Sequence, residues 1–444
     1  MTRCLPAALM ALLPLALLAQ EPAREPPRDW IDPDTGHRVV RLSEEPGSQS
    51  LYFHQNGYTP DGAKLVITTP SGLSAVNLKT RAVEKVVEGR VNLIMVGRKT
   101  GQAYYVRAGA VFAVDLDTKV SREIAKLPAG ASIATVNADE TLLAGTITEG
   151  RLAAAPAAPP AAPKVPAAPP AAQPAAPPAA PKAPAVPPTA PPAAPRGQDN
   201  YPGKGDMMER RLAARLPMQL VVLDARTGQA STILRSTDWL NHVQFSPTDP
   251  AQLLLCHEGP WHKVDRTWTI RADGSGLTLV HRRTMNMEIE GHEFFGSDGR
   301  EVWYDLQTPR SEVFWLASYE LATGRRTWYH LERSEWSVHF NQSPDGTLFA
   351  GDGGGPSSVA APGNGQWIYL FRPQLVPDRT DGALPDAARL VRPGVLKAEK
   401  LVNLAAHDYG LEPNVSFTPD GRWVVFRSNM FGPTHVFAVE VKRP

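Results

Sequence analysis

Histidine is the residue type best suited to do chemistry in this chain of 444 residues. Its imidazole titrates near neutral pH, so it can accept a proton, ligate a metal ion or bind an anionic group. Eleven histidines are present. Seven of them stand where strands are expected to begin: His54, His242, His257, His262, His292, His339 and His407. A single histidine is more often structural than functional, but the same relative position in several repeats favours a shared site.

Several other chemistries find no support in the sequence. It contains neither a Gly-x-Ser-x-Gly elbow nor a His-Glu-x-x-His pair, the signatures of serine hydrolases and zinc proteases. The glycine-rich run 351–355 lacks the strand and helix that a nucleotide site requires. Cys256 beside His257 suggests a Cys/His nucleophile, with a buried structural thiol as the alternative. The charge balance, 46 Lys+Arg against 45 Asp+Glu, argues against nucleic-acid binding.

The elements that must position these histidines are short strands joined by a recurring turn. The turn has the form Ser/Thr-Pro-Asp-Gly and precedes an apolar, β-branched strand. Proline fixes φ, aspartate supports the turn and glycine takes a positive φ, so the chain reverses tightly. Copies lie at 58–67, 245–255, 296–304, 342–350 and 417–426, with weaker ones near 97–101 and 137–140.

Seven copies at intervals of roughly 40 to 55 residues predict an all-β fold, a seven-bladed β-propeller. Residues 36–42 are expected to pair with the last blade and close the ring, and 376–400 to form an insertion in the sixth blade. The third blade is interrupted and resumes near 219–224. A two-sheet sandwich is the alternative fold, but it would not explain the repeated turns.

Composition divides the chain further. Residues 1–20 read as a cleaved signal peptide, with a basic start and an apolar stretch, which predicts a periplasmic or secreted protein. Residues 25–444 are expected to form one propeller domain, interrupted at 152–196 by a disordered insertion of Ala and Pro that cannot build a core. Two cysteines, Cys4 and Cys256, provide no disulfide framework. No other stretch is long and apolar enough to span a membrane.

Ring closure would bring strand-end loops around a central funnel, where substrate-binding residues are expected. His54 and Gln55 stand at the entrance of the first blade and would bind a carboxylate or hydroxyl, or else cap a turn. His242 and His257 are expected to line the funnel. Arg427, after the last-blade strand, would meet a carboxylate bidentately.

Three strings carry a resemblance to a known family. Residues 256–261 read Cys-His-Glu-Gly-Pro-Trp, 265–268 read Asp-Arg-Thr-Trp, and 291–295 read Gly-His-Glu-Phe-Phe. Together with Leu-Glu-Pro-Asn-Val-Ser-Phe at 411–417, they resemble the oligogalacturonate lyases, a family of polysaccharide lyases. The likeness covers most of the chain outside the first residues and the Ala/Pro tract, and it is densest from 239 to 437.

The resemblance implies a seven-bladed propeller that cleaves oligogalacturonides, fragments of pectin, by β-elimination with a bound divalent metal, usually Mn²⁺. It assigns the general base to His292 and one metal ligand to His339, and it places Arg266 close to the substrate, as a carboxylate clamp or a proton shuttle. The general chemistry agrees with these roles. Elimination removes a weakly acidic proton beside a uronate carboxylate, so a cation must absorb the developing charge while a neutral imidazole takes the proton.

The chain departs from the better-known family pattern at the metal. Where that pattern has a glutamine and two histidines, this chain has Tyr409, Glu412 and Asn414, with His407 just upstream. A mixed set of His339, His407, Glu412 and Asn414 would suit Mn²⁺ or a similar ion. The alternative is that Glu412 pairs with an arginine and no metal binds.

Taken together, the sequence predicts an exported oligogalacturonate lyase-like enzyme that acts on an acidic oligosaccharide. Two alternatives stay open: a non-catalytic binding propeller similar to TolB, and a lyase for another acidic oligosaccharide.

Overall fold

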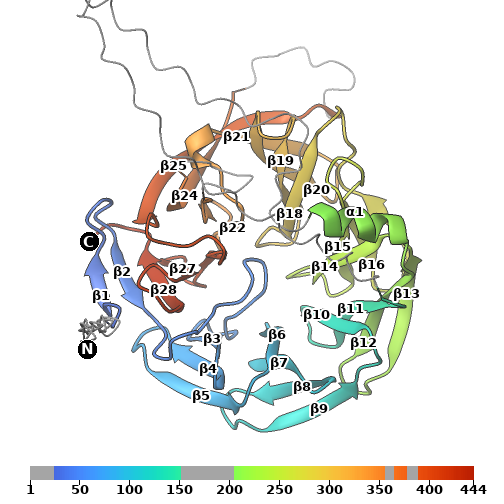
Figure 1. Ribbon diagram of the computed structural model, residues 1–444, viewed down its shortest axis with the longest axis horizontal. Coiled ribbons are helices and arrows are strands. Elements are labelled where there is room, and N and C mark those ends of the chain that lie inside the picture. The colour runs from blue at the N-terminus through green and yellow to red at the C-terminus, as the bar shows by residue number, and fades with distance from the viewer. Residues whose placement is uncertain (1–24, 152–204, 356–364, 378–388) are drawn as a thin grey trace, which may run out of the picture.

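The chain forms a ring of small antiparallel sheets around a central axis (Figure 1). The computed structural model describes residues 25–151, 205–355, 365–377 and 389–444. Six hydrogen-bonded sheets are present, and the one with eight strands consists of two four-stranded blades joined at their outer edges. The described residues therefore form seven blades. This confirms the predicted seven-bladed propeller and shows that the sandwich alternative is wrong.

Each blade runs from an inner strand near the axis to an outer strand at the rim (Figure 1). Blades 1 to 3 contain β3 (Lys64–Thr69), β4 (Gly72–Asn77) and β5 (Val83–Glu88); β6 (Asn92–Val96), β7 (Gln102–Arg107), β8 (Ala110–Asp115) and β9 (Ser121–Lys126); and β10 (Ala131–Val136), β11 (Leu142–Thr148), β12 (Met218–Asp224) and β13 (Ala230–Ser236). Blades 4 and 5 contain β14 (Trp239–Phe245), β15 (Gln252–Glu258), β16 (Thr267–Arg271) and β17 (Thr278–Leu279); and β18 (Ile289–Phe295), β19 (Glu301–Gln307), β20 (Phe314–Glu320) and β21 (Arg326–Leu331). Blades 6 and 7 contain β22 (Phe340–Gln342), β23 (Phe349–Gly351), β24 (Trp367–Leu375) and β25 (Arg392–Asn403); and β26 (Ser416–Phe417), β27 (Trp423–Ser428), β28 (His435–Glu440), β2 (Arg38–Arg41) and β1 (Asp29–Ile31).

The recurring turn has the geometry that its residues predict. In the last copy, Gly421 has a φ of 67°. The Asp420 carboxylate accepts hydrogen bonds from the Thr418 hydroxyl at 2.6 Å and from the backbone N–H of Arg422 at 3.1 Å. The turn therefore satisfies its own polar groups and fixes the register of β26 with β27.

The core lies between blades. Seven clusters of buried apolar side chains occur, and each contains residues from two adjacent blades. Between blades 2 and 3, for example, Ile94 and Tyr104 pack with Leu143 and Leu223. A blade has no independent core, so the ring gains its stability from closure.

The N-terminal segment closes the ring as predicted. Strand β2 pairs antiparallel with β28, with Val39 opposite Val439 and Arg41 opposite Phe437. Blade 7 thus combines the first and last strands of the described chain (Figure 1). Strand β12 also begins where the third blade was expected to resume.

Blades 5 and 6 differ from the prediction at their junction. Strand β25 pairs antiparallel with β24 over nine positions and also parallel with β21, from Thr327 opposite Arg392 to His330 opposite Val395. The expected insertion at 376–400 is therefore too long, because 392–400 belong to β25. Strand β25 was not predicted because it contains a Pro-Gly pair and interspersed lysines, which are unusual in a strand.

Two short helices complete the described chain: α1 (Gly205–Ala214) and a 3₁₀ turn, η1 (Arg333–Glu335). Helix α1 was not predicted. Its Met208 is buried, and its Arg211 lies over the Trp239 ring. None of the helices described is long and apolar enough to cross a membrane. The expected signal peptide, and the Ala/Pro tract at 152–196, lie outside the described residues.

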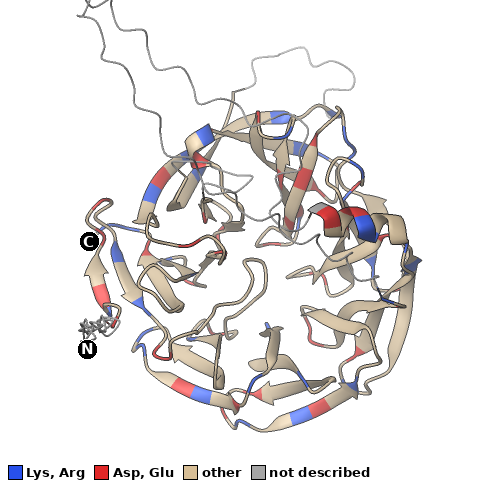
Figure 2. Cartoon of the chain, in the orientation of Figure 1, with Lys and Arg blue, Asp and Glu red and all other residues tan. Residues whose placement is uncertain are grey.

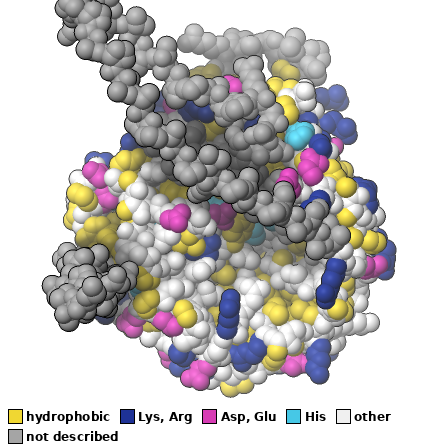
Figure 3. Space-filling model, viewed as in Figure 1, with side chains coloured by type: hydrophobic (Ala, Val, Ile, Leu, Met, Phe, Trp, Pro, Cys, Tyr) yellow, Lys and Arg dark blue, Asp and Glu magenta, His cyan; other side chains and the backbone are white. Residues whose placement is uncertain are grey.

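Charged side chains are concentrated at the rim. Outer strands such as β5 and β9 alternate Lys or Arg with Asp or Glu (Figure 2). On the face seen in Figure 3, the two signs are interspersed over the part of the surface that the structure describes. This pattern lacks the single-sign stripe typical of nucleic-acid-binding surfaces.

Candidate active site at the propeller axis

Two histidines reach the axis on bulged inner strands. In blade 4, Asn241 pairs with Cys256 and Gln244 with Leu254, so β14 has one extra residue. In blade 5, Gly291 pairs with Asp305 and Phe294 with Trp303, which leaves the same excess in β18. The residue after the first pair is a histidine in both blades, His242 with a φ of 47° and His292 with a φ of 48°. A positive φ in a residue with a side chain is strained, and such strain is common at functional sites.

A carboxylate on the second strand, or directly after it, supports two of the histidines at the axis. The Nδ1 atom of His292 lies 3.0 Å from Asp305 on β19. His339, at the start of blade 6, has its Nδ1 2.7 Å from Asp352, which follows β23. Because a carboxylate accepts the Nδ1 proton, both rings keep the Nε2 lone pair for other partners. The corresponding residue for His242 is Cys256, on β15.

Contacts among these side chains form a closed circuit. The rings of His292 and His339 lie 4.8 Å apart, and Trp261 contacts both His292 and Arg266. From Arg266 the circuit continues through Glu293 to His242, and Tyr52 then joins His242 to His339. We call these seven residues the axial cluster: Tyr52, His242, Trp261, Arg266, His292, Glu293 and His339. They come from the entrance of blade 1 and from blades 4, 5 and 6.

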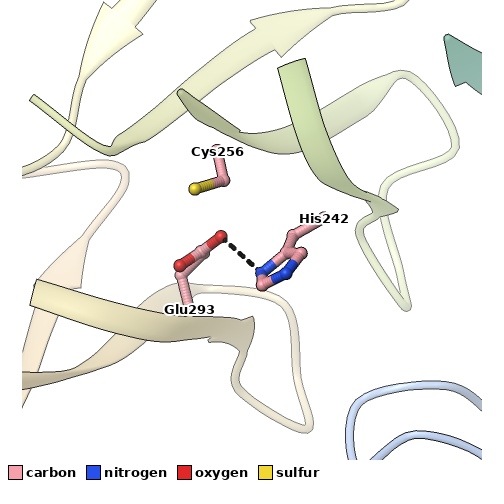
Figure 4. Close-up of side chains that lie close together, drawn as sticks. All are labelled: His242, Cys256 and Glu293. Atoms are coloured by element: carbon pink, nitrogen blue, oxygen red, sulfur yellow. Dashed lines mark ion pairs between the residues drawn. The ribbon is translucent and has the colours of Figure 1, made fainter. Parts of the chain in front are cut away.

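Glu293 is the buried anion of the axial cluster. Its side chain is fully buried and lies 3.2 Å from His242 Nδ1 and 4.0 Å from the Arg266 guanidinium. Figure 4 shows its carboxylate between the His242 ring and the Cys256 sulfur. Burial alone would raise the pKa of Glu293, but the charges of His242 and Arg266 outweigh burial and hold the pKa well below its usual range. Glu293 is therefore ionised, and its charge stabilises Arg266 inside the protein.

His292 and His54, two of the histidines near the axis, have pKa values shifted in opposite directions. Burial alone would lower the pKa of His292, but the charge and hydrogen bond of Asp305 outweigh it, so the pKa lies above its ordinary value. Burial and the neighbouring His242 lower the pKa of His54 to about 3. His292 is thus the better base, whereas His54 stays neutral at all ordinary pH values.

The structure brings together most of the residues expected at the site. His292, Arg266, His242 and His339 belong to the axial cluster. His54 contacts Tyr52, with ring centroids 5.1 Å apart. Glu412 lies at the edge of the cluster, with its carboxylate 3.9 Å from His339 Nε2 and its side chain 45% exposed.

Three expected substrate-binding residues have structural partners instead. Gln55 accepts a hydrogen bond from the backbone N–H of Tyr52, so it caps the turn, as the alternative interpretation held. His257 stacks on Trp268, away from the axial cluster. Arg427 donates to the Glu412 carbonyl at 2.8 Å and to Gln49 at 2.9 Å, which ties two loops together.

The expected metal set fits an ion at only two of its four residues. Both ring nitrogens of His407 are engaged, Nδ1 with Ser428 and Nε2 with the Leu411 carbonyl, so this arrangement leaves it no lone pair for a metal. Asn414 is fully buried, and its side-chain oxygen accepts from the Phe53 N–H at 3.3 Å. Both hydrogen-bond within loops whose conformation the spacing did not reveal.

His339 and Glu412 do fit a divalent ion. His339 directs Nε2 toward the Glu412 carboxylate, while Asp352 orients the ring from behind, which is the usual support for a metal-binding histidine. The Tyr52 hydroxyl, 3.1 Å from the same Nε2, would have to yield to an ion. Imidazole and carboxylate together suit Mn²⁺.

Sequence reasoning missed five residues of the site: Tyr52, Trp261, Glu293, Asp305 and Asp352. Asp305 left a usable signal, because it places a charge among the apolar residues of β19, whereas β18 contains Glu290 and His292 besides Glu293. A buried carboxylate in such a strand needs a partner, and a nearby histidine is an obvious one. Tyr52 and Asp352 lie outside strands and left no comparable signal.

Comparison with known sequences connects the chain with one family. The sequence profile of the family described as "Oligogalacturonate lyase" matches residues 211–443. The chain is 29% identical over 230 residues to the oligogalacturonate lyase of Dickeya dadantii and 28% identical over 245 residues to the oligogalacturonide lyase of Pectobacterium atrosepticum. Each match covers 50% of this chain and 55% of the relative, so the chain spans about half the length of these curated relatives.

Solved structures match over a longer range. An oligogalacturonate lyase in complex with manganese has a TM-score of 0.67, and one from Vibrio parahaemolyticus has a TM-score of 0.68. Both are 20% identical and cover 93% of this chain and 96% of their own. At this identity the likeness establishes the fold alone, and it agrees with the seven blades described above.

Proposed function

The chain belongs to the oligogalacturonate lyase family, and on that basis we propose that it cleaves oligogalacturonides by β-elimination. The observation that carries the proposal is the convergence of His292, Arg266 and His339 in the axial cluster. A base, a fixed cation and a candidate metal ligand are the groups that uronate elimination needs.

His292 is the proposed general base. Asp305 holds its Nδ1 proton, so Nε2 accepts the proton at C5 of the uronate. The C4–oxygen bond then breaks, a C4–C5 double bond forms, and the leaving oxygen takes a proton from solvent. Because no nucleophile or bound intermediate is required, the absence of a serine elbow from the sequence is consistent with this reaction.

Arg266 is the proposed carboxylate clamp. Its guanidinium is always charged and planar, so it pairs with both oxygens of a uronate carboxylate. Negative charge accumulates there as the C5 proton leaves, and a buried cation stabilises that charge more strongly than an exposed one. Glu293 keeps the guanidinium in the axial cluster.

Mn²⁺ would be held by His339 and Glu412, with Asp352 orienting His339 from behind. When bound, such an ion acts as a Lewis acid toward the substrate carboxylate. This assignment rests on the chemistry of the donor set, and a solved family member is described as a manganese complex. It drops His407 and Asn414 from the expected set.

The deciding experiment is to incubate the purified protein with oligogalacturonides, with and without Mn²⁺, and to follow the ultraviolet absorbance of the unsaturated product. The wild type should form product, whereas the H292N variant should not. If other uronate oligosaccharides are cleaved and oligogalacturonides are not, the alternative of a lyase for another acidic sugar is correct. If none is cleaved under either condition, the enzymatic proposal fails and a binding propeller remains.

We also propose export from the cytoplasm, since residues 1–20 have the pattern of a signal peptide. Expression in a Gram-negative host followed by fractionation and N-terminal sequencing tests this. Mature protein in the periplasm that begins near residue 21 would support export. Full-length protein confined to the cytoplasm would contradict it.

A further inference from the structure

Blades 4, 5 and 6 each combine a histidine near the axis with a residue on or directly after the second strand. In blade 4 this second residue has a different chemical type. The inner-strand histidines of blades 5 and 6 pair with Asp305 and Asp352. In blade 4 the position that corresponds to Asp305 holds Cys256, because Asn241 faces Cys256 as Gly291 faces Asp305. His242 therefore has a thiol where its counterparts have a carboxylate.

The missing carboxylate comes from the neighbouring blade. Glu293 follows His292 in the bulge of β18, where the corresponding residue of blade 4 is the apolar Val243. It extends toward blade 4, and one possible ligand atom each from His242, Cys256 and Glu293 lies within 4.8 Å of the other two (Figure 4). A nitrogen, a sulfur and an oxygen donor thus converge at the seam between two blades.

Glu293 has polar groups that the protein alone does not satisfy. Its side chain is fully buried, yet neither carboxylate oxygen accepts a hydrogen bond of good geometry from any residue described. Its ion pairs with His242 and Arg266, at 3.2 and 4.0 Å, supply charge but not that geometry. The two neighbouring cations keep the carboxylate ionised, and its oxygens remain available as ligands for a metal ion.

We propose that His242, Cys256 and Glu293 bind a divalent cation of the zinc class. Thiolate and imidazole select zinc or cobalt over manganese or calcium, which prefer oxygen donors. Three protein ligands leave a fourth position for water or a substrate carboxylate, as in many catalytic zinc sites. The side chain of His242, 21% exposed, connects the site to solvent.

Charge and protons balance when the ion binds. The ion ligates His242 through Nδ1, the nitrogen that faces Glu293, and it replaces both the Nδ1 proton and the thiol proton of Cys256, which are released to solvent. One thiolate and one carboxylate neutralise the two charges of the metal, so Arg266 is left with its full positive charge. An anionic ligand could then bind the open position of the ion beside the Arg266 guanidinium.

This site is separate from the Mn²⁺ site proposed at His339 and Glu412, and it does not depend on lyase activity. Cobalt is the probe, because a Co²⁺–thiolate bond gives a charge-transfer absorption in the near ultraviolet that nitrogen and oxygen ligands do not give. The full-length protein, freed of metal with a chelator, is titrated with Co²⁺ and then with Zn²⁺. We expect the band to saturate at one cobalt per chain and to disappear when zinc displaces cobalt.

Matched variants assign the band. C256S and E293Q should lose it, whereas C4S, which removes the only other thiol in the chain, and H339N, at the other proposed site, should keep it. Circular dichroism checks that each variant is folded. No band from the folded wild type at excess cobalt would overturn the proposal, and so would a band that survives in C256S or vanishes in C4S. If C256S fails to fold, the C4S titration still assigns the band, because Cys256 is then the only thiol in the chain.

Discussion

The inner strands of blades 2 and 5 both contain a β-bulge, but the bulged residues have different roles. Both inner strands contain one extra residue: Ile94 in blade 2 lies in the bulge of β6, and His292 in blade 5 lies in that of β18. Ile94 packs into the core between blades and has a negative φ, whereas His292 has a positive φ and faces the axial cluster. The bulge is therefore a feature of the propeller fold, whereas the positive φ and the polar side chain are features of the candidate active site.

The largest expected effect is at the functional bulge. H292N should lower the rate of product formation by about 10³-fold, because the general base is lost. Asparagine tolerates the positive φ, so the thermal unfolding temperature should stay within a few degrees of wild type. Ultraviolet assays and calorimetry measure the two quantities. Normal turnover in H292N would show that the bulge of β18 is not needed for catalysis, like that of β6.

Arg266 is expected to have the second largest effect, because its guanidinium is the proposed carboxylate clamp in the axial cluster. R266K should reduce kcat by about 100-fold, because lysine keeps the charge but not the bidentate geometry. Steady-state kinetics with oligogalacturonides checks this. A change in KM alone would show that the guanidinium binds the substrate without stabilising the transition state.

Asp305 tests whether the histidine needs its second-strand partner. D305N should cost about 30-fold in activity and shift the acidic limb of the pH–rate profile to lower pH. The sign follows from the base being active only when neutral: Asp305 raises the pKa of His292, so its removal lowers that pKa and lets the neutral form persist in more acidic solution. An unchanged limb in D305N would mean that another group is the base.

Glu412 should have a smaller effect that excess metal can reverse. E412Q is expected to raise the Mn²⁺ concentration for half-maximal activity by about tenfold, because a carboxylate ligand becomes a neutral amide. Titration of the chelated enzyme with Mn²⁺ measures this, with H407N as a control that should titrate like the wild type. If H407N, and not E412Q, weakens activation by Mn²⁺, the ion is bound near His407 and not near Glu412.

The smallest effect on turnover is expected at the structural bulge. I94A should leave kcat within about twofold of wild type while lowering the free energy of unfolding by about 2–4 kcal/mol, since it leaves a cavity between blades. Urea denaturation and kinetics at low temperature separate the two properties. Strong loss of kcat in the folded variant would show that blade 2 also contributes to the site.

The sequence was enough to predict the blades, because each turn satisfies its own polar groups within a few residues, as Thr418 and Asp420 do. It also placed His292 and Arg266 near the axis, since their strings match a known family. It could not reveal the bulges, because one extra residue in a strand leaves no mark in the hydrophobic pattern. The partner Asp352 was missed because it lies outside a strand, just after β23.

The hydrogen bonds of His407 and Asn414 could not be predicted for a different reason. Both lie in the loop before blade 7, where side chains form hydrogen bonds with nearby backbone groups. Such bonds depend on loop conformation, which spacing alone does not determine. Strand β25 was overlooked because it gains its place from two partners, β21 and β24, that are remote in the sequence.

The parallel pairing of β21 with β25 makes one joint of the ring unlike the others in the described chain, which have packed side chains but no shared sheet. Opening this joint would break backbone hydrogen bonds as well as expose apolar surface. Local opening on heating should therefore begin between other pairs of blades. The backbone amides of Thr327 to His330 should be among the slowest of any outer strand to exchange with deuterium. Blades 5 and 6, which carry His292 and His339, would then move together as a rigid unit while contacts between other blades open.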